Sequence, residues 1–278
     1  MKQGLDFVRS SGAAFLAASA PPLAPLTISS VKRWYRLQAS TPVSSEYQTI
    51  TEVLGGAALS QTAAARKPAA DTSSNGLPVA TFDGTDVMMF TLDAAGTGNN
   101  GTSQWWTALR IKPPDFGATQ SILGWSSAAG TAPNKLGVSF VNDGTGKLSF
   151  TVFASGFNGR IYTTPGSFAA AAWNHLYIQF DGTRTNEADL DGATSDAKVR
   201  IFSGTTALAI TATDTGTGGA VSALLSSVGT GALGGANDND TPTVPLRNGT
   251  QIGPNIFFGT TPLTSAELAA LVNFEVVT

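Results

Sequence analysis

Short runs of alternating apolar and polar residues, separated by glycine, asparagine and aspartate, most limit how this 278-residue chain can fold. Residues 103–111 place Trp105 and Ile111 on one face of an extended chain and Trp106 and Arg110 on the other. This period of two is that of a half-buried β-strand. The same pattern predicts further strands at residues 135–142, 147–153, 173–181, 197–202 and 252–258.

Turn and cap residues complete the predicted secondary structure. An Asp-Gly pair at residues 143–144, between two alternating runs, indicates a β-hairpin. Thr264 and Glu267 have the spacing of a helix capping box, and Leu268 and Leu271 follow at helical spacing, so one short C-terminal helix is predicted. Many short strands and almost no helix indicate an all-β fold, either an antiparallel sandwich or a barrel.

Composition divides the chain into two parts. Residues 1–30 are rich in alanine and end in a proline-rich segment, so we expect an N-terminal arm and a Pro-rich linker there. Residues 31–278 carry the strand pattern and form the predicted β domain. Residues 213–236 are mostly Gly, Ala, Ser and Thr and are predicted to be a long loop.

Charge and residue content exclude several functions. Lys and Arg number 16 and Asp and Glu 19, which gives a net charge of -3 and no basic field to hold nucleic acid. The lack of cysteine excludes disulfides and thiolate metal sites, and the single histidine, His175, excludes a multi-histidine site. No apolar run in the sequence reaches about 18 residues, so no membrane-spanning helix is predicted.

Three segments resemble concanavalin A-like lectin and laminin G-like domains. Residues 75–84 (NGLPVATFDG) resemble the opening strand, residues 173–183 (WNHLYIQFDGT) the central strand, and residues 262–268 (PLTSAEL) the closing helical turn of that family. The resemblance covers residues 75–274 and implies a β-sandwich of the jelly-roll type. It also implies a structural role for His175.

Segments that precede this region resemble bacteriophage structural proteins that carry such a domain. They are WY at residues 34–35, ITEVLGGAALSQ at 50–61 and RKP at 66–68. The resemblance implies a component of a tailed-bacteriophage virion, such as a capsid decoration protein, a head fibre or a tail-associated protein, which docks on other virion proteins through its N-terminal arm. We expect a homo-oligomer, because such proteins occur in repeated copies and a net charge of -3 gives little repulsion between them.

Residues that could carry catalysis are few. A glycosidase needs two carboxylates facing one bond, and hydrolases of the resembling fold carry a Glu-x-Asp-x-Glu strand that this chain lacks. The nearest pair, Asp189 and Asp191, is interpreted as a glycine-terminated loop. His175 has no serine or cysteine nucleophile motif nearby. The sequence therefore predicts a protein that is not an enzyme and has no cofactor.

Two groups are candidate binding residues. Trp106 beside Arg110 would stack on a sugar or anchor a protein interface if that face of the strand is exposed, and the alternative is that a second layer covers it. The other group has the oxygen ligands that suit a calcium ion, although asparagine and aspartate are also common in plain turns. Its members are Asn237, Asp238, Asn239 and Asp240.

Two functions from different classes follow. The first is a non-enzymatic structural protein of the virion that displays the β domain outward. The alternative is a carbohydrate-binding adhesin that recognises host surface glycans. The missing carboxylate pair argues against a third function, a glycan hydrolase, and a glycan array is the experiment that separates the first two.

Overall fold

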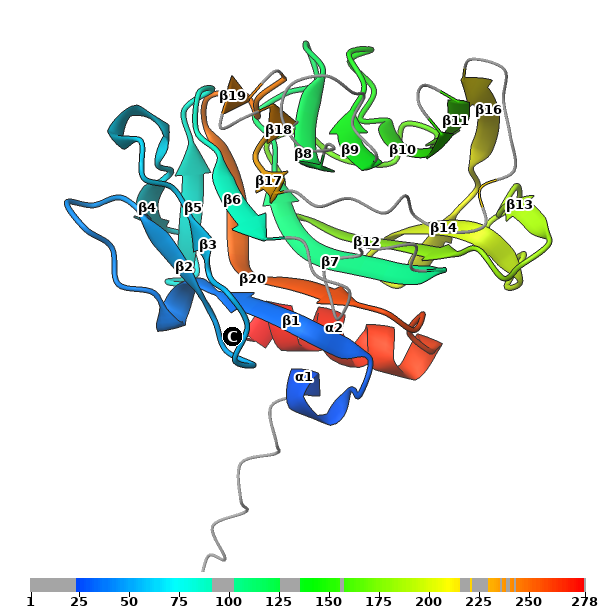
Figure 1. The fold of residues 1–278 in the computed structure, drawn as a ribbon, viewed down its shortest axis with the longest axis horizontal. Coiled ribbons are helices and arrows are strands. Elements are labelled where there is room, and N and C mark those ends of the chain that lie inside the picture. Colours follow the sequence, from blue (N-terminus) through cyan, green and yellow to red (C-terminus); the bar gives the residue numbers. More distant parts are fainter. Residues whose placement is uncertain are drawn as a thin grey trace, which may run out of the picture.

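The computed structural model describes residues 24–91, 103–125, 136–155, 158–215, 221, 230–235, 237–238, 241–242 and 244–277. Two antiparallel sheets face each other in this part of the chain, and two helices cover one of them (Figure 1). Sheet A contains β1 (Val31–Arg36), β4 (Ala69–Thr72), β5 (Pro78–Phe82), β7 (Gln104–Lys112), β12 (Asn174–Asp181), β13 (Asn186–Ala188), β14 (Ala197–Ser203), β15 (Thr206–Leu208) and β20 (Thr250–Gly259). Sheet B contains β3 (Leu59–Ser60), β6 (Met88–Thr91), β8 (Gln120–Trp125), β9 (Leu136–Phe140), β10 (Leu148–Ser155), β11 (Asn158–Thr163), β16 (Thr211–Thr215) and β17 (Thr230–Leu233).

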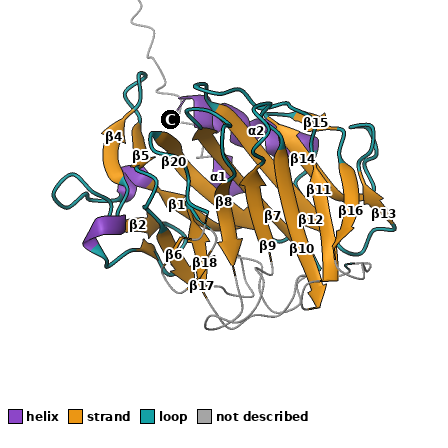
Figure 2. Cartoon of the chain, turned by 90° about the horizontal axis from the view of Figure 1, so that it is seen from above, coloured by secondary structure: helices purple, strands orange, loops and turns teal. Residues whose placement is uncertain are grey.

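The remaining elements connect or cover these sheets. Strand β2 (Thr49–Glu52) belongs to both sheets, and β18 (Asn237–Asp238) pairs only with β19 (Thr241–Pro242). The α-helices are α1 (Ala24–Thr27) and α2 (Ser265–Val277), which Figure 1 shows on the outer side of sheet A and Figure 2 draws in purple. Among the described residues, no helix is long and apolar enough to span a membrane.

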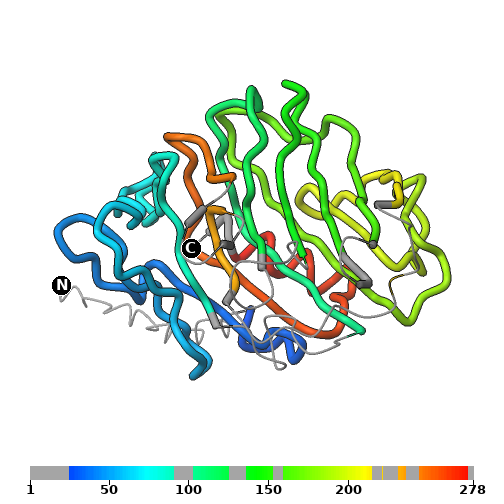
Figure 3. The backbone as a smooth tube through the Cα atoms, turned by 45° about the horizontal axis from the view of Figure 1, so that its top comes forward, coloured from blue at the N-terminus to red at the C-terminus, as the bar shows by residue number. Residues whose placement is uncertain are grey.

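Strand pairing gives each sheet a simple order. In sheet A, β20, β7, β12 and β14 lie side by side. On the side of β20 away from β7, β5 pairs with its first residues and β1 with its last residues. On the side of β14 away from β12, β13 and β15 pair with it. In sheet B the order is β16, β11, β10, β9, β8, β17, β6 and β3. In Figure 3, strands β8, β9 and β10 of sheet B are the green antiparallel segments of the tube. All pairings are antiparallel except that of β13 with β14.

Among the described residues, a backbone ladder joins the two sheets along one edge. Strand β2 pairs through Glu52 with Tyr35 of β1 and through Ile50 with Leu59 of β3, so it passes from sheet A to sheet B. At the opposite edge, β13 of sheet A lies near β16 of sheet B, and no backbone ladder joins the two among the described residues (Figure 1). We call this edge the open margin.

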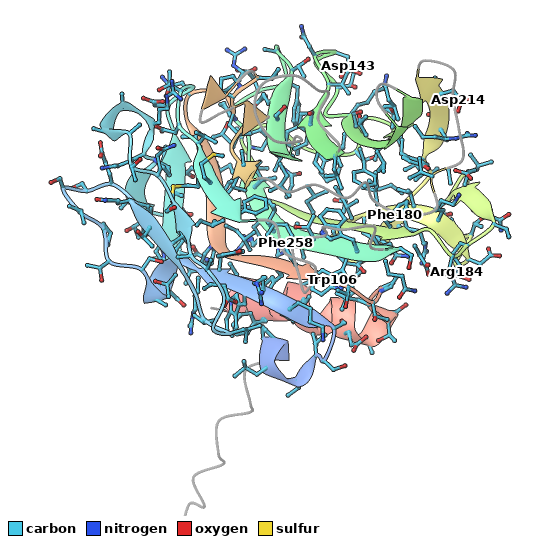
Figure 4. The ribbon with its side chains drawn as sticks, viewed as in Figure 1. Trp106, Asp143, Phe180, Arg184, Asp214 and Phe258 are labelled. Atoms are coloured by element: carbon cyan, nitrogen blue, oxygen red, sulfur yellow. The ribbon has the colours of Figure 1, made fainter. Side chains whose placement is uncertain are left out.

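Every second side chain of the strands points inward, and these apolar side chains fill the space between the sheets. Trp105 of β7 stacks on Phe150 of β10, with 6.0 Å between ring centroids, and so links the two layers. Phe180 and Phe258 also point between the layers in Figure 4. These aromatic rings and the branched aliphatic residues around them form one continuous core.

A second, smaller core lies on the outer face of sheet A. It forms because α1 and α2 pack there and bury the alternate side chains of the same strands. The capping box begins α2 as predicted: Glu267 Oε2 accepts a hydrogen bond from the Thr264 amide at 2.8 Å, and the Glu267 amide donates to Thr264 Oγ1 at 3.2 Å. The members of this core are Ile28, Val31, Trp34, Trp106, Ala108, Tyr177, Phe202, Phe257, Leu268, Leu271 and Phe274.

The all-β sandwich, the β9–β10 hairpin and the C-terminal helix are confirmed, whereas the jelly-roll connectivity stays a prediction. The long loop predicted at residues 213–236 is wrong at both ends, because β16 and β17 occupy them. The alternation of apolar residues does not predict β17, because this strand contains mostly small residues in place of large apolar ones. A side chain at Gly231, for example, would collide with the Phe90 ring. Residues 1–23 of the predicted arm lie outside the described residues.

Candidate functional site

The predicted contact residue Trp106 is not at the surface. Its indole is fully buried in the second core, 5.8 Å from the ring of Tyr177 (Figure 4). Gly259 makes room for it, since a side chain there would collide with the indole. The expected glycan or partner contact through Trp106 is therefore wrong, because helices cover this face of β7.

Arg110 is nearly buried as well. Its guanidinium lies over the ring of Trp173, with 5.0 Å to the ring centroid, in a cation–π contact. On the neighbouring strand, the cross-strand partner of Arg110 is His175. Little of the Arg110 side chain is left for a glycan, so the predicted pair does not form an exposed site.

The predicted calcium loop is described only in part. The backbone of Asn237 and Asp238 forms β18, which pairs with β19. The side chains of these two residues, and Asn239 and Asp240 entirely, lie outside the described residues. In the rest of the described chain, no three acidic or imidazole groups gather in a way that could hold a metal ion. Calcium binding at this loop stays a prediction.

The carboxylates of Asp189 and Asp191 shape a turn, as expected. Asp189 is fully buried; its Oδ2 lies 2.9 Å from Arg200 Nε, and its Oδ1 accepts the Thr194 amide at 2.8 Å. Asp191 Oδ1 accepts the amides of Ala193 at 2.8 Å and of Thr194 at 3.1 Å. The loop interpretation is confirmed, and these contacts hold in place the residue between the two aspartates.

That residue, Leu190, is the most exposed large apolar side chain in the described part of the chain, at 69% exposure. It lines two pockets at the open margin, each of about 340 Å³. We call the two pockets together the Leu190 groove. The Glu187 pocket is lined by Asn186, Glu187, Ala188, Leu190, Thr194 and Ala212. The Lys147 pocket is lined by Lys147, Thr163, Thr164, Pro165, Leu190, Ala209, Ile210 and Thr211.

A polar cluster joins the two sheets beside the Glu187 pocket. Glu187 Oε1 lies 2.5 Å from Lys198 Nζ, and its Oε2 accepts a hydrogen bond from the Tyr162 hydroxyl at 3.2 Å. Arg160 Nε lies 3.7 Å from Glu187 Oε2 and 3.1 Å from Asp214 Oδ1. Burial, together with the Glu187 carboxylate, raises the pKa of Tyr162, so this phenol stays protonated and donates its hydrogen bond. We call these five residues the Glu187 cluster.

A row of hydroxyl side chains crosses sheet B and ends at the Lys147 pocket. Strands β8, β9, β10, β11 and β16 are neighbours in sheet B (Figure 2). Their register places one serine or threonine of each strand opposite that of the next. These residues are Ser121, Ser139, Ser149, Thr163 and Thr211. The last two of them line the Lys147 pocket. One end of this row therefore supplies hydrogen-bonding groups to the groove.

The Leu190 groove is suited to holding a polyhydroxylated ligand. Asn186, Thr163 and Thr211 offer polar groups, while Leu190 and Pro165 offer apolar surface for the C–H face of a ring. The carboxylates of Glu187 and Asp214 are both ion-paired, an arrangement that fixes charge in place rather than one built to transfer protons.

A larger pocket, of about 500 Å³, lies elsewhere, between the turn after β1 and strand β4. Its one aromatic ring, Tyr47, is buried, and its carboxylate, Asp71, accepts hydrogen bonds from Thr81 and Gln251. Charged groups from both sheets meet at the Leu190 groove and not at this pocket, so we take the groove as the candidate site.

Sequence reasoning missed the groove because three separate strands and the turns beside them build it. Strands β11, β13 and β16 meet at the open margin only in the folded sandwich. One local signal existed: Leu190 is an apolar residue between two aspartates and directly before the turn containing Gly192. An apolar side chain held in a polar turn has no core to enter and therefore projects into solvent.

Comparison with known proteins defines the class of fold. No protein-family model matches the chain, and no curated protein sequence matches it. Among solved structures, it is similar to a Trypanosoma rangeli sialidase in complex with sialic acid, with a TM-score of 0.54, 11% identity and coverage of 88% of this chain and 33% of that one. A second structure of Trypanosoma rangeli sialidase gives a TM-score of 0.52 and 13% identity, with the same coverage.

A third match is the CBM40 of the Ruminococcus gnavus IT-sialidase bound to α2,3 sialyllactose, with a TM-score of 0.44, 14% identity and coverage of 66% of this chain and 95% of that one. The chain spans about a third of the length of the sialidase structures that it matches. At these identities the likeness concerns the fold alone, which is a β-sandwich.

Proposed function

We propose that this chain is a non-catalytic carbohydrate-binding protein and that the Leu190 groove holds the glycan. The sequence leaves carbohydrate binding open as the alternative to a virion role, and the geometry of the groove favours it. The observation that carries the proposal is the pair of adjoining pockets around one highly exposed leucine, with amide and hydroxyl groups on their walls. Sugar-binding sites need such a combination of apolar contact and fixed polar groups.

The fold likeness alone assigns no ligand, so the proposal rests on the groove. The absence of catalysis is part of the same proposal, because Glu187, the carboxylate that lines the groove, is ion-paired with Lys198, and the nearby Asp214 is ion-paired with Arg160. A glycosidase would instead need one carboxyl group available as an acid and a second available as a base or nucleophile.

A glycan array with the full-length chain tests this function. We expect binding to a subset of glycans, at least a tenfold loss of affinity in Leu190→Asp, and no release of reducing sugar from bound glycans. Leu26→Asp is the matched control, because Leu26 of α1 is also exposed, at 57%, and lies away from the groove. Binding that Leu190→Asp leaves intact would show that the site is elsewhere, and no binding on the array would refute the function.

Three further expectations from the sequence remain proposals. They are location in a bacteriophage virion, docking on virion proteins through the N-terminal arm, and assembly as a homo-oligomer. A glycan-binding groove is compatible with all three.

A further inference from the structure

The charges around the Leu190 groove bear on which glycans it accepts, an inference that rests on the proposed function. Two cations, Lys198 and Arg160, face Glu187, and a third, Arg200, pairs with the buried Asp189. In the Lys147 pocket, Lys147 Nζ lies 3.0 Å from Asp143 Oδ2. Each of these cations already has a carboxylate partner.

Two more carboxylates surround the Glu187 pocket without a cation. Asp196 Oδ1 accepts a hydrogen bond from Asn186 Nδ2 at 2.8 Å, and Asp191 Oδ1 accepts one from Thr194 Oγ1 at 3.0 Å. Both donors line the pocket. Among the described residues, neither aspartate forms an ion pair, so this side of the groove has an excess of negative charge.

At the Glu187 pocket an acidic sugar would therefore meet repulsion, and each cation that the structure describes beside this pocket already has a carboxylate partner. To reach Lys198, the carboxylate of the sugar would have to displace Glu187 from a side chain that is only 5% exposed. Separating such a pair leaves a poorly solvated charge behind, which is strongly unfavourable. Repulsion from Asp191 and Asp196 would act over about 10 Å at moderate salt.

A neutral sugar meets none of these costs. Its hydroxyl groups both donate and accept hydrogen bonds, so they can use the free acceptor positions of the aspartates and the hydroxyls of Thr163 and Thr211. Its C–H face can pack against Leu190, which both pockets share. The two pockets together accommodate a chain of sugar units.

We propose that the Leu190 groove selects electrically neutral glycans of two or more units and rejects glycans whose bound unit is sialic or uronic acid. This differs from the sialic acid and sialyllactose present in the matched structures, although the fold is similar.

Matched glycan pairs test the selectivity directly. An array carries neutral oligosaccharides beside their sialylated counterparts, such as lactose beside α2,3-sialyllactose, and binding of the full-length chain is measured at low and at high salt. We expect the neutral member of each pair that binds to bind at least tenfold more tightly, and the ratio to shrink in high salt because salt screens exposed charges.

Three variants separate the possible outcomes. The double variant Asp191→Asn with Asp196→Asn should reduce the discrimination several-fold, whereas Asp71→Asn, an exposed aspartate on β4, should leave it unchanged. Equal or tighter binding of sialylated members, lost in Leu190→Asp, would overturn the selectivity but keep the proposed function. If no member of any pair binds, the proposed function and this inference both fall.

Discussion

The loop between β5 and β6 holds a carboxyl group whose ionisation should destabilise the fold. Asp86 is only 3% exposed, and its Oδ2 accepts the Asp83 amide at 2.8 Å. Burial, with a contribution from the nearby Asp83 carboxylate, raises the pKa of Asp86 from 3.8 to about 7. Burial also acts against the charge on Asp83, but hydrogen bonds from Thr85 and Asp86 together outweigh it and lower the pKa of Asp83. Asp83 is thus charged at pH values where Asp86 still holds its proton.

The raised pKa of Asp86 determines how the free energy of unfolding changes with pH. Because the folded state holds the Asp86 proton more tightly than the unfolded state, the stability from this group is complete below pH 4 and is lost as pH rises through about 7. A tenfold change in proton affinity is worth about 1.4 kcal/mol, so the full loss is about 4 kcal/mol. The side-chain amide of the variant Asp86→Asn is neutral at every pH, and its oxygen can still accept the Asp83 amide. We expect this variant to gain about 4 kcal/mol over the native chain at pH 8 and to match it near pH 4, which corresponds to a difference in Tm on the order of 10 °C.

Urea unfolding followed by tryptophan fluorescence at pH 4.5, 6 and 8 measures the difference. The control is Asp143→Asn, because hydrogen bonds from Thr145 lower the pKa of the exposed Asp143 and its substitution should act in the opposite direction. A constant difference in the free energy of unfolding between Asp86→Asn and the native chain at all three pH values would refute the reasoning.

Three further predictions concern the cores and the Glu187 cluster. Trp106→Ala should lower the free energy of unfolding by about 3–5 kcal/mol, since it empties the second core; a loss below about 1 kcal/mol in urea unfolding would contradict its burial. Thr264→Ala should cost about 1 kcal/mol by removing the cap of α2, and Thr264→Ser should restore most of it in the same assay. Lys198→Met should cost about 1–3 kcal/mol by leaving Glu187 without its main partner. The double variant Lys198→Met with Glu187→Leu should recover much of that loss, and strictly additive losses in the double-mutant cycle would argue against the pair.

Local sequence signals predicted much of sheet A and sheet B. The alternation in β7 places Trp105 and Ile111 in the main core, as expected, because a strand turns every second side chain to the same face. The glycine of the β9–β10 turn has a positive φ of 72° at Gly144, a conformation that the Asp-Gly pair favours. These features depend on neighbours in sequence and so can be predicted from it.

The candidate site could not be predicted in the same way. Whether Trp106 is exposed depends on α2, which begins more than 150 residues later in the chain and packs back over β7. The Glu187 cluster likewise combines residues of β11, β13, β14 and β16, whose proximity is set by the order of strands in two sheets. Periodicity describes which face a side chain occupies but not which element covers that face.

The passage of β2 from one sheet to the other has a mechanical consequence. Along this edge, the sandwich can separate only by breaking a continuous set of backbone hydrogen bonds. Along the opposite edge, side-chain contacts such as that of Tyr162 with Glu187 hold the sheets together, and these break and re-form far more easily. We therefore expect any relative motion of the two sheets to be larger at the open margin, where the groove lies, than along β2.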